Sequence, residues 1–110
     1  MPDSDNERIL GDIATKLLFE NDRVRIWEMR LPAGTQGAVH EHEFDHVLIQ
    51  ISGDRMAIAP EPDTQGVYKD YLEADVFPGN YFYVEKGGIE TARNVGEQDF
   101  HEIVVELKES

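Results

Sequence analysis

The chain has 110 residues, of which 23 are Asp or Glu and 10 are Lys or Arg, so its formal net charge is −13. This length predicts one domain with a single small core. Binding to a nucleic-acid backbone or to an anionic membrane surface needs clustered Lys and Arg, and the absence of such a cluster argues against both partner classes.

The chain contains no cysteine, which excludes disulfides and thiolate metal sites and fits a reducing compartment. Residues 1–7 are acidic and polar and do not resemble a secretory signal. No segment approaches the roughly 20 apolar residues that a membrane-spanning helix needs. We therefore expect a cytoplasmic protein.

The predicted elements follow a polar N-terminal arm, residues 1–14. Eight segments have the short apolar or alternating pattern of strands, and Gly, Pro or Asn-Asp turn signals separate most of them. In chain order these segments are 15–20, 23–31, 46–52, 55–59, 67–74, 81–84, 89–95 and 100–107. No long segment has a helical period, so residues 15–110 are predicted to form one all-β sandwich or barrel.

Alternation within these strands predicts which side chains face the barrel interior. Trp27 belongs to one face of its strand and is expected to pack inside. In the last strand one face is apolar except for His101, so we expect His101 to look into the barrel, as a packed histidine or as a base beside a site. Gln50 shares its face with His46 and Leu48 and is expected to line a pocket or to be an ordinary polar residue on a half-buried strand.

Three of the four histidines, His40, His42 and His46, fall close together. Side chains at i and i+2 on a strand share a face, so His40 and His42 can direct two imidazoles at one point, and His46 can reach back across the turn. Imidazole ligands suit Zn, Fe, Ni and Cu and, with a carboxylate, Mn. The alternative interpretation is three polar residues in a solvated acidic loop.

The spacing of these histidines resembles the first motif of the cupin family, in which Gly, His, His, Glu and Gly recur at fixed intervals. The residues at those intervals are Gly34, His40, His42, His46 and Gly53. A second cupin motif expects Gly, Pro, Gly, His and Asn. The residues at its intervals are Gly79, Glu85, Gly87, Glu90 and Asn94.

Two departures from the family pattern compensate each other. His46 stands where the family has its Glu ligand, and Glu90 stands where it has its last His, so three imidazoles and one carboxylate remain. The resemblance implies that these side chains bind one divalent ion of Fe, Mn, Zn or Ni. The implied ligands are His40, His42, His46 and Glu90. Glu43 and Asp45 are fallback carboxylates whose parity points away from the first two histidines, and the alternative for Glu90 is an exposed carboxylate after a turn.

The resemblance covers about residues 15–107 and implies a double-stranded β-helix, the cupin or jelly-roll barrel. Residues 19–31 also look like the opening strands of small single-domain bacterial cupins, of the cupin 2 barrel type, that are loosely linked to β-alanine degradation. Both faces of segment 46–52 are largely apolar, and small cupins commonly pack sheets together, so a homodimer is expected. The aromatic run Tyr81–Tyr83 is expected in the core or at a subunit interface.

A metal ion with three His and one Glu leaves two adjacent positions for a carboxylate or dicarbonyl substrate. The leading expectation is therefore a metal-dependent enzyme that acts on a small oxygen-rich molecule, with dioxygenase chemistry first and isomerase, lyase or decarboxylase chemistry as alternatives. Two other functions stay open, a non-catalytic cupin that binds a metal or small ligand and a metal-free degenerate cupin. Gln50 and His101 are the candidate catalytic residues.

Overall fold

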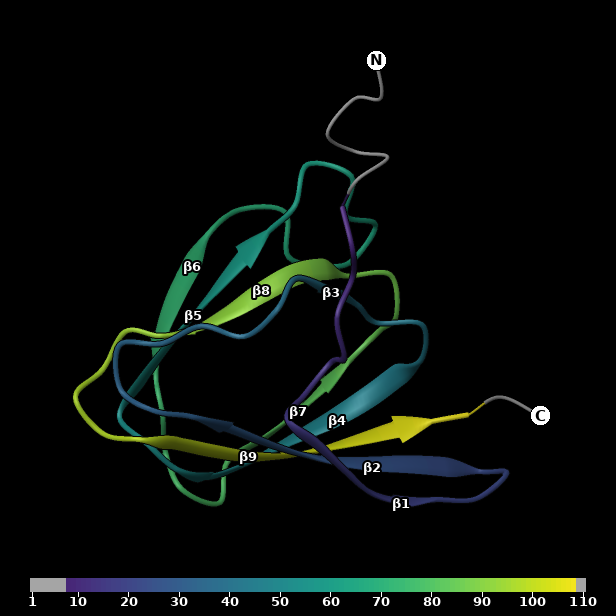
Figure 1. Ribbon diagram of the computed structural model, residues 1–110, viewed down its shortest axis with the longest axis horizontal. Helices are drawn as coiled ribbons and strands as arrows, with labels where there is room; N and C mark the ends of the chain where they lie inside the picture. Colours follow the sequence, from purple (N-terminus) through teal and green to yellow (C-terminus); the bar gives the residue numbers. More distant parts are fainter. Residues whose placement is uncertain (1–7, 109–110) are drawn as a thin grey trace.

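The structure is a computed structural model that describes residues 8–108, and nine strands in this range form two sheets. The five-stranded sheet contains, in spatial order, β1 (Lys16–Glu20), β2 (Val24–Leu31), β9 (Phe100–Leu107), β4 (Asp45–Ser52) and β7 (Tyr81–Val84). The four-stranded sheet contains β3 (His40–Glu41), β8 (Ile89–Asn94), β5 (Arg55–Pro60) and β6 (Leu72–Asp75). Figure 1 shows the two sheets facing each other across the interior. The predicted all-β barrel is confirmed, and the described residues contain no helix that could span a membrane.

The strands differ from the predicted segments at two places. The two-residue strand β3, which pairs His40 with Glu90 of β8, was not expected. Segment 67–74 is mostly loop, since pairing with β5 begins only at Leu72, opposite Ile58. Just before this segment, Thr64 Oγ1 accepts the backbone N–H groups of Gly66 and Ile89, so a side chain ties the start of the loop to β8.

The core is small and divides into two clusters. One contains Met29, Leu31, Met56, Val76, Ala92 and Phe100. The other contains Ile13, Trp27 and Val104, which confirms that Trp27 packs inside the barrel. Ile13 belongs to the segment expected to be an arm, and Gly11 N–H donates to the carbonyl of Val39 at 2.8 Å. The described part of that segment is therefore packed against the barrel.

The inward face of β9 is the opposite of the one predicted. Its buried side chains are those of Phe100, Glu102, Val104 and Glu106, whereas those on the other face, His101 included, are only half-buried. His101 Nε2 contacts Glu28 Oε2 at 3.1 Å on the outer face. The expectation that His101 looks into the barrel was wrong, because the register of β9 with β2 sets Val104 beside the inward Trp27.

Candidate metal centre

Three side chains that could hold a metal ion meet where β3 runs beside β8. His40 lies directly opposite Glu90 in the ladder, and His42 follows β3. Reciprocal backbone bonds of 2.8 Å, from His42 N–H to Gly88 O and from Gly87 N–H to His42 O, extend the pairing. One nitrogen or oxygen atom from each of His40, His42 and Glu90 lies within 4.8 Å of the others.

The distances within this cluster suit one ion. His40 Nε2 lies 3.1 Å from His42 Nε2, and His42 Nε2 lies 3.6 Å from Glu90 Oε2. Two ligand atoms about 2.1 Å from one ion lie about 3.0–3.6 Å apart when they subtend about 90–120°. His40, His42 and Glu90 thus have both the donor types and the separations of a metal site.

Hydrogen bonds orient the imidazoles. His40 Nδ1 donates to Ala38 O at 3.0 Å, and His46 Nδ1 donates to Phe44 O at 2.9 Å. Because a carbonyl only accepts, the proton of each neutral ring is on Nδ1, and the Nε2 lone pair is available to a metal. In His42 the buried Nδ1 has no hydrogen-bond partner among residues 8–108, while Nε2 faces the cluster.

The surroundings of His40, His46 and Glu90 lower all three pKa values, and this favours the protonation states in which these groups bind metals. Burial is the largest cause that lowers the pKa of His40 and that of His46, the latter to about 4, and the charge of His42 adds to it. Burial acts to raise the pKa of Glu90, but the interaction with His42 and the charge of the other two imidazoles outweigh it, so this pKa lies below its usual value. Neutral imidazoles and an ionised carboxylate are metal-binding forms.

His46 is next to the cluster but is not one of its three members. Its ring stacks on that of His42, with centroids 4.0 Å apart and an interplanar angle of 13°. Its role as a fourth ligand stays a prediction. The solvated-loop interpretation of the histidines and the exposed position considered for Glu90 are both wrong, since these side chains are between 1% and 8% exposed.

Because Gly88 has no side chain, the Glu90 carboxylate can occupy the space beside it. A Cβ on Gly88 would lie 2.9 Å from Glu90 Oε1 and 3.8 Å from His42 Cδ2. Gly87 has a φ of +112°, a conformation that favours glycine, and its backbone pairs with His42. Asn94 has a structural role, because its Nδ2 donates to Leu31 O and Gln98 O.

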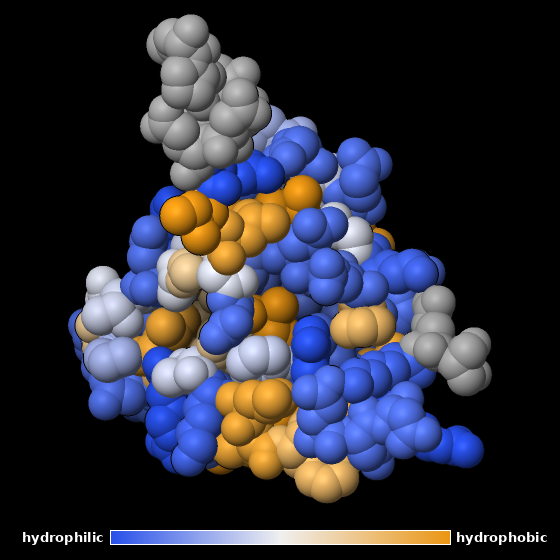
Figure 2. All heavy atoms as spheres, turned by 45° about the vertical axis from the view of Figure 1, so that its right-hand side comes forward, coloured by the Kyte–Doolittle hydropathy of each residue, from blue (hydrophilic) through white to orange (hydrophobic). Residues whose placement is uncertain are grey.

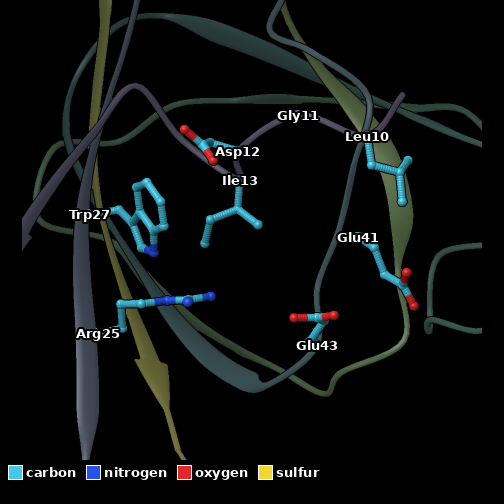
Figure 3. A pocket seen from close by; sticks show the side chains of 8 residues that line it. All are labelled: Leu10, Gly11, Asp12, Ile13, Arg25, Trp27, Glu41 and Glu43. Atoms are coloured by element: carbon cyan, nitrogen blue, oxygen red, sulfur yellow. The ribbon is translucent and has the colours of Figure 1, made fainter. Parts of the chain in front are cut away.

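The two fallback carboxylates lie outside the cluster. Asp45 accepts hydrogen bonds from the Tyr83 hydroxyl and the Lys86 N–H, both at 2.9 Å. Glu43 lines a separate pocket of about 240 Å³, together with Arg25 and Trp27. Figure 3 shows the Arg25 guanidinium beside the Trp27 ring in this pocket.

A cavity of about 140 Å³ lies inside the barrel; we call it the barrel cavity. Its lining residues are Met29, Leu48, Gln50, Met56, Ile58, Tyr68, Leu72, Ala74, Phe82, Ala92, Phe100 and Glu102. Gln50 lines it, and its Oε1 accepts the Phe77 N–H at 3.1 Å. His101 does not line it. Glu102 does, although it belongs to the face of β9 opposite to the one expected to look into the barrel. Glu102 shares its face of β9 with the apolar residues Phe100 and Val104, and this shared face was the sequence signal that could have identified Glu102 as a cavity residue.

Comparisons with known proteins identify the fold. No protein-family model matches the sequence, and neither does any curated protein. The structure is similar to a cupin domain from Bordetella pertussis Tohama I (TM-score 0.70, 18% identity, covering 90% of this chain and 100% of that one). It is also similar to an RmlC-like cupin with a double-stranded β-helix fold from Methanocaldococcus jannaschii (TM-score 0.67, 22% identity, covering 84% and 77%). A third is a cupin 2 conserved barrel domain protein from Salinispora arenicola CNS-205 (TM-score 0.55, 15% identity, covering 74% and 60%). The chain thus has the double-stranded β-helix fold of cupins, as predicted.

Proposed function

We propose that the protein binds one divalent transition-metal ion through His40, His42 and Glu90, with His46 as the fourth ligand, and acts as a metal-dependent enzyme on a small oxygen-rich molecule. The observation that carries this proposal is the convergence of two imidazoles and a carboxylate, all buried, at 3.1 and 3.6 Å from one another. This donor set suits Fe, Mn, Zn or Ni.

The ion would supply Lewis-acid chemistry or, as Fe(II), oxygen activation, and dioxygenase chemistry on a carboxylate or dicarbonyl is the first reaction to test. The protein's contribution is orientation and exclusion of water. The bonds from His40 Nδ1 to Ala38 O and from His46 Nδ1 to Phe44 O fix two rings before any ion binds. Isomerase, lyase or decarboxylase chemistry, binding without turnover and a metal-free cupin are the alternative outcomes.

Metal analysis of untagged protein tests the site. We expect about one equivalent of metal in the wild type, at least a tenfold lower affinity in His42→Ala, and unchanged metal in His101→Ala, since His101 lies on the outer face. Less than about 0.1 equivalent in the wild type, or equal metal content in His42→Ala, would overturn the metal site. His46→Ala tests the fourth ligand in the same assay, and an unchanged affinity would remove it from the set.

Gly88→Ala is a finer probe of the same site. The added Cβ would approach Glu90 Oε1 to 2.9 Å, so the flexible carboxylate must move while the backbone keeps its place. We expect weaker metal binding with an unchanged circular dichroism spectrum. Oxygen uptake by the Fe(II)-loaded protein with β-diketones, catechols and carboxylates then tests dioxygenase chemistry, and no uptake with any of them would remove it.

We further propose that the protein is a homodimer that packs the outer face of its five-stranded sheet, and that it works in the cytoplasm. This face carries the half-buried apolar side chains of Val47, Ile49, Ile103 and Val105. Figure 2 shows hydrophobic side chains gathered at the bottom of the view, at the level of this sheet in Figure 1.

The aromatic run of β7 supports the same interface. Tyr81 and Tyr83 are 72% and 60% exposed, so they are not core residues, and they pair with Ile49 and Val47 at the edge of this face. In an interface with two-fold symmetry each substitution occurs in both subunits, so one changed residue acts at two places in the interface. We therefore expect light scattering to give a dimer mass for the wild type and a monomer mass for Ile103→Lys, and a wild-type monomer would overturn the dimer.

A further inference from the structure

The barrel cavity begins beside the metal cluster. Inward side chains alternate along β4, so Leu48 and Gln50, which line the cavity, share a face with the buried His46. On β8 the cavity residue Ala92 lies two positions from Glu90. Inward residues two positions apart on a strand are roughly 7 Å apart, so a ligand in the cavity is a near neighbour of the cluster.

Three polar side chains interrupt the otherwise apolar wall, those of Gln50, Tyr68 and Glu102. Within residues 8–108 no group forms a hydrogen bond or ion pair with the Glu102 carboxyl, although this side chain is only 7% exposed. The Tyr68 hydroxyl and the Gln50 amide nitrogen also have no hydrogen-bond partner in the described part of the chain. Glu102 and Gln50 are buried and Tyr68 is half-buried. A few polar groups with free hydrogen-bonding capacity on a largely apolar wall are typical of a ligand site.

The ladders place two of these groups side by side. Glu102 of β9 lies directly opposite Gln50 of β4 and opposite Met29 of β2. Cross-strand neighbours on one face have Cβ atoms about 4.5–5.5 Å apart. The Glu102 carboxyl and the Gln50 amide can therefore form hydrogen bonds to the same ligand atom. The Met29 side chain provides apolar surface beside them.

The polar side chains of the cavity wall supply hydrogen-bond donors rather than charges. Among residues 8–108 no Lys, Arg or His lines it, and burial together with the charge of Glu90 raises the pKa of Glu102 to about 8. The same two causes raise the pKa of Tyr68. At neutral pH, Glu102, Gln50 and Tyr68 thus each offer a donor, from O–H, N–H and O–H groups, and a bound anion would find no cation in the wall.

We propose that the barrel cavity binds an uncharged carbonyl compound of about six to eight non-hydrogen atoms, whose oxygen accepts hydrogen bonds from the Glu102 carboxyl and the Gln50 amide. The size follows from the volume of about 140 Å³, since a cavity of about 150 Å³ accommodates benzene. Glu102 is then a specificity-determining residue that prefers a ketone over a carboxylate. The inference deepens the proposed function by naming its substrate class, and the cavity itself does not depend on the metal.

The test uses chelator-treated protein and three probes of matched size, namely 2-pentanone, butyrate and 2-methylpentane. The methyl NMR signals of Met29 and Met56 report binding, because both side chains line the cavity. We expect 2-pentanone to shift both signals and to bind at least tenfold more tightly than butyrate at pH 6.5. Equal or tighter binding of butyrate, or no shift of either signal, would overturn the inference.

Variants separate the role of Glu102 from general packing. Glu102→Leu removes the donor and is expected to weaken 2-pentanone binding at least fivefold without weakening 2-methylpentane binding. Glu102→Gln keeps a donor and is expected to stay within twofold of the wild type, and His101→Ala is the neighbouring control on the outer face. Unchanged 2-pentanone binding by Glu102→Leu would contradict the assignment. Ketone binding by the chelator-treated protein, combined with less than about 0.1 equivalent of metal in the untreated wild type, would uphold the cavity and reject the metal enzyme.

Discussion

The inner face of β9 carries two buried glutamates four residues apart, and their carboxyl groups have opposite surroundings. Glu106 Oε1 accepts hydrogen bonds of 2.6 Å from both Arg25 Nε and Trp27 Nε1. Glu102 has no such partner in the described part of the chain and faces the apolar barrel cavity. Residue type, strand and face are the same, so the difference comes from the neighbouring strand, where Arg25 pairs with Glu106 and Met29 with Glu102.

This contrast shows how one strand can both hold the barrel together and contribute to a binding site. A buried carboxylate that accepts hydrogen bonds from a guanidinium ties two strands together, and the hydrogen bond to Glu106 raises the pKa of Arg25. A buried carboxyl without a cation holds its proton and keeps its hydrogen-bonding capacity for a ligand. The end of β9 that carries Glu106 thus holds two strands together, and we call it the anchor. The end that carries Glu102 is available to bind a ligand, and we call it the recognition end.

Breaking the anchor has the largest expected effect. Arg25→Met leaves the fully buried Glu106 carboxylate with only the Trp27 N–H, and removing one partner of a buried ion pair costs about 3–5 kcal/mol of the free energy of unfolding. Urea unfolding monitored by Trp fluorescence measures this loss. Arg23→Met, at an exposed position, is the matched control and should stay within about 0.5 kcal/mol. A loss below about 1 kcal/mol in Arg25→Met would show that the pair is not an anchor.

The recognition end is expected to give a smaller effect that depends on pH. The folded pKa of Glu102, about 8, lies above its unfolded value of 4.5, because of burial and the charge of Glu90. The folded state therefore holds an extra proton between these values, and the free energy of unfolding falls as the pH rises from 4.5 through 8. Glu102→Gln removes this dependence and should be more stable than the wild type by about 2–4 kcal/mol at pH 8, with no such gain near pH 5.

Chemical unfolding of metal-free wild type and Glu102→Gln at several pH values measures the difference. Other groups that titrate in this range are common to both proteins, so the difference between the two stability curves reports Glu102. Stability curves that run parallel from pH 5 to pH 8 would contradict a protonated Glu102 and remove the contrast between the two ends of β9.

The smallest expected effect is the coupling between the two ends. Residues four apart on a strand are roughly 13 Å apart, and substitutions more than about 10 Å apart usually add within about 0.5 kcal/mol. The double variant with Arg25→Met and Glu102→Gln, unfolded at pH 8, should therefore show the sum of the two single effects. A coupling above about 1 kcal/mol would mean that the anchor and the cavity act as one unit.

Much of the site could be predicted from local spacing. His40 and His42 are two residues apart, so any extended backbone brings their imidazoles to one side. The position of Glu90 followed only from the resemblance to the cupin motif, because it reaches the histidines through the β3–β8 ladder, and β3 has only two residues. A strand this short has no alternation to detect in a sequence.

The sequence by itself determined the all-β class, most of the strands and the histidine spacing, because these depend on alternation and on glycine and proline at fixed positions. It did not determine β3 or the loop part of segment 67–74. Only the tertiary structure decided which face of β9 points inward. Alternation groups Glu102 with Glu106 and His101 with Ile103, but it does not say which group is inside. The more apolar group faces outward here, because Arg25 and Trp27 of β2 allow Glu106 to be buried and the cavity surrounds Glu102.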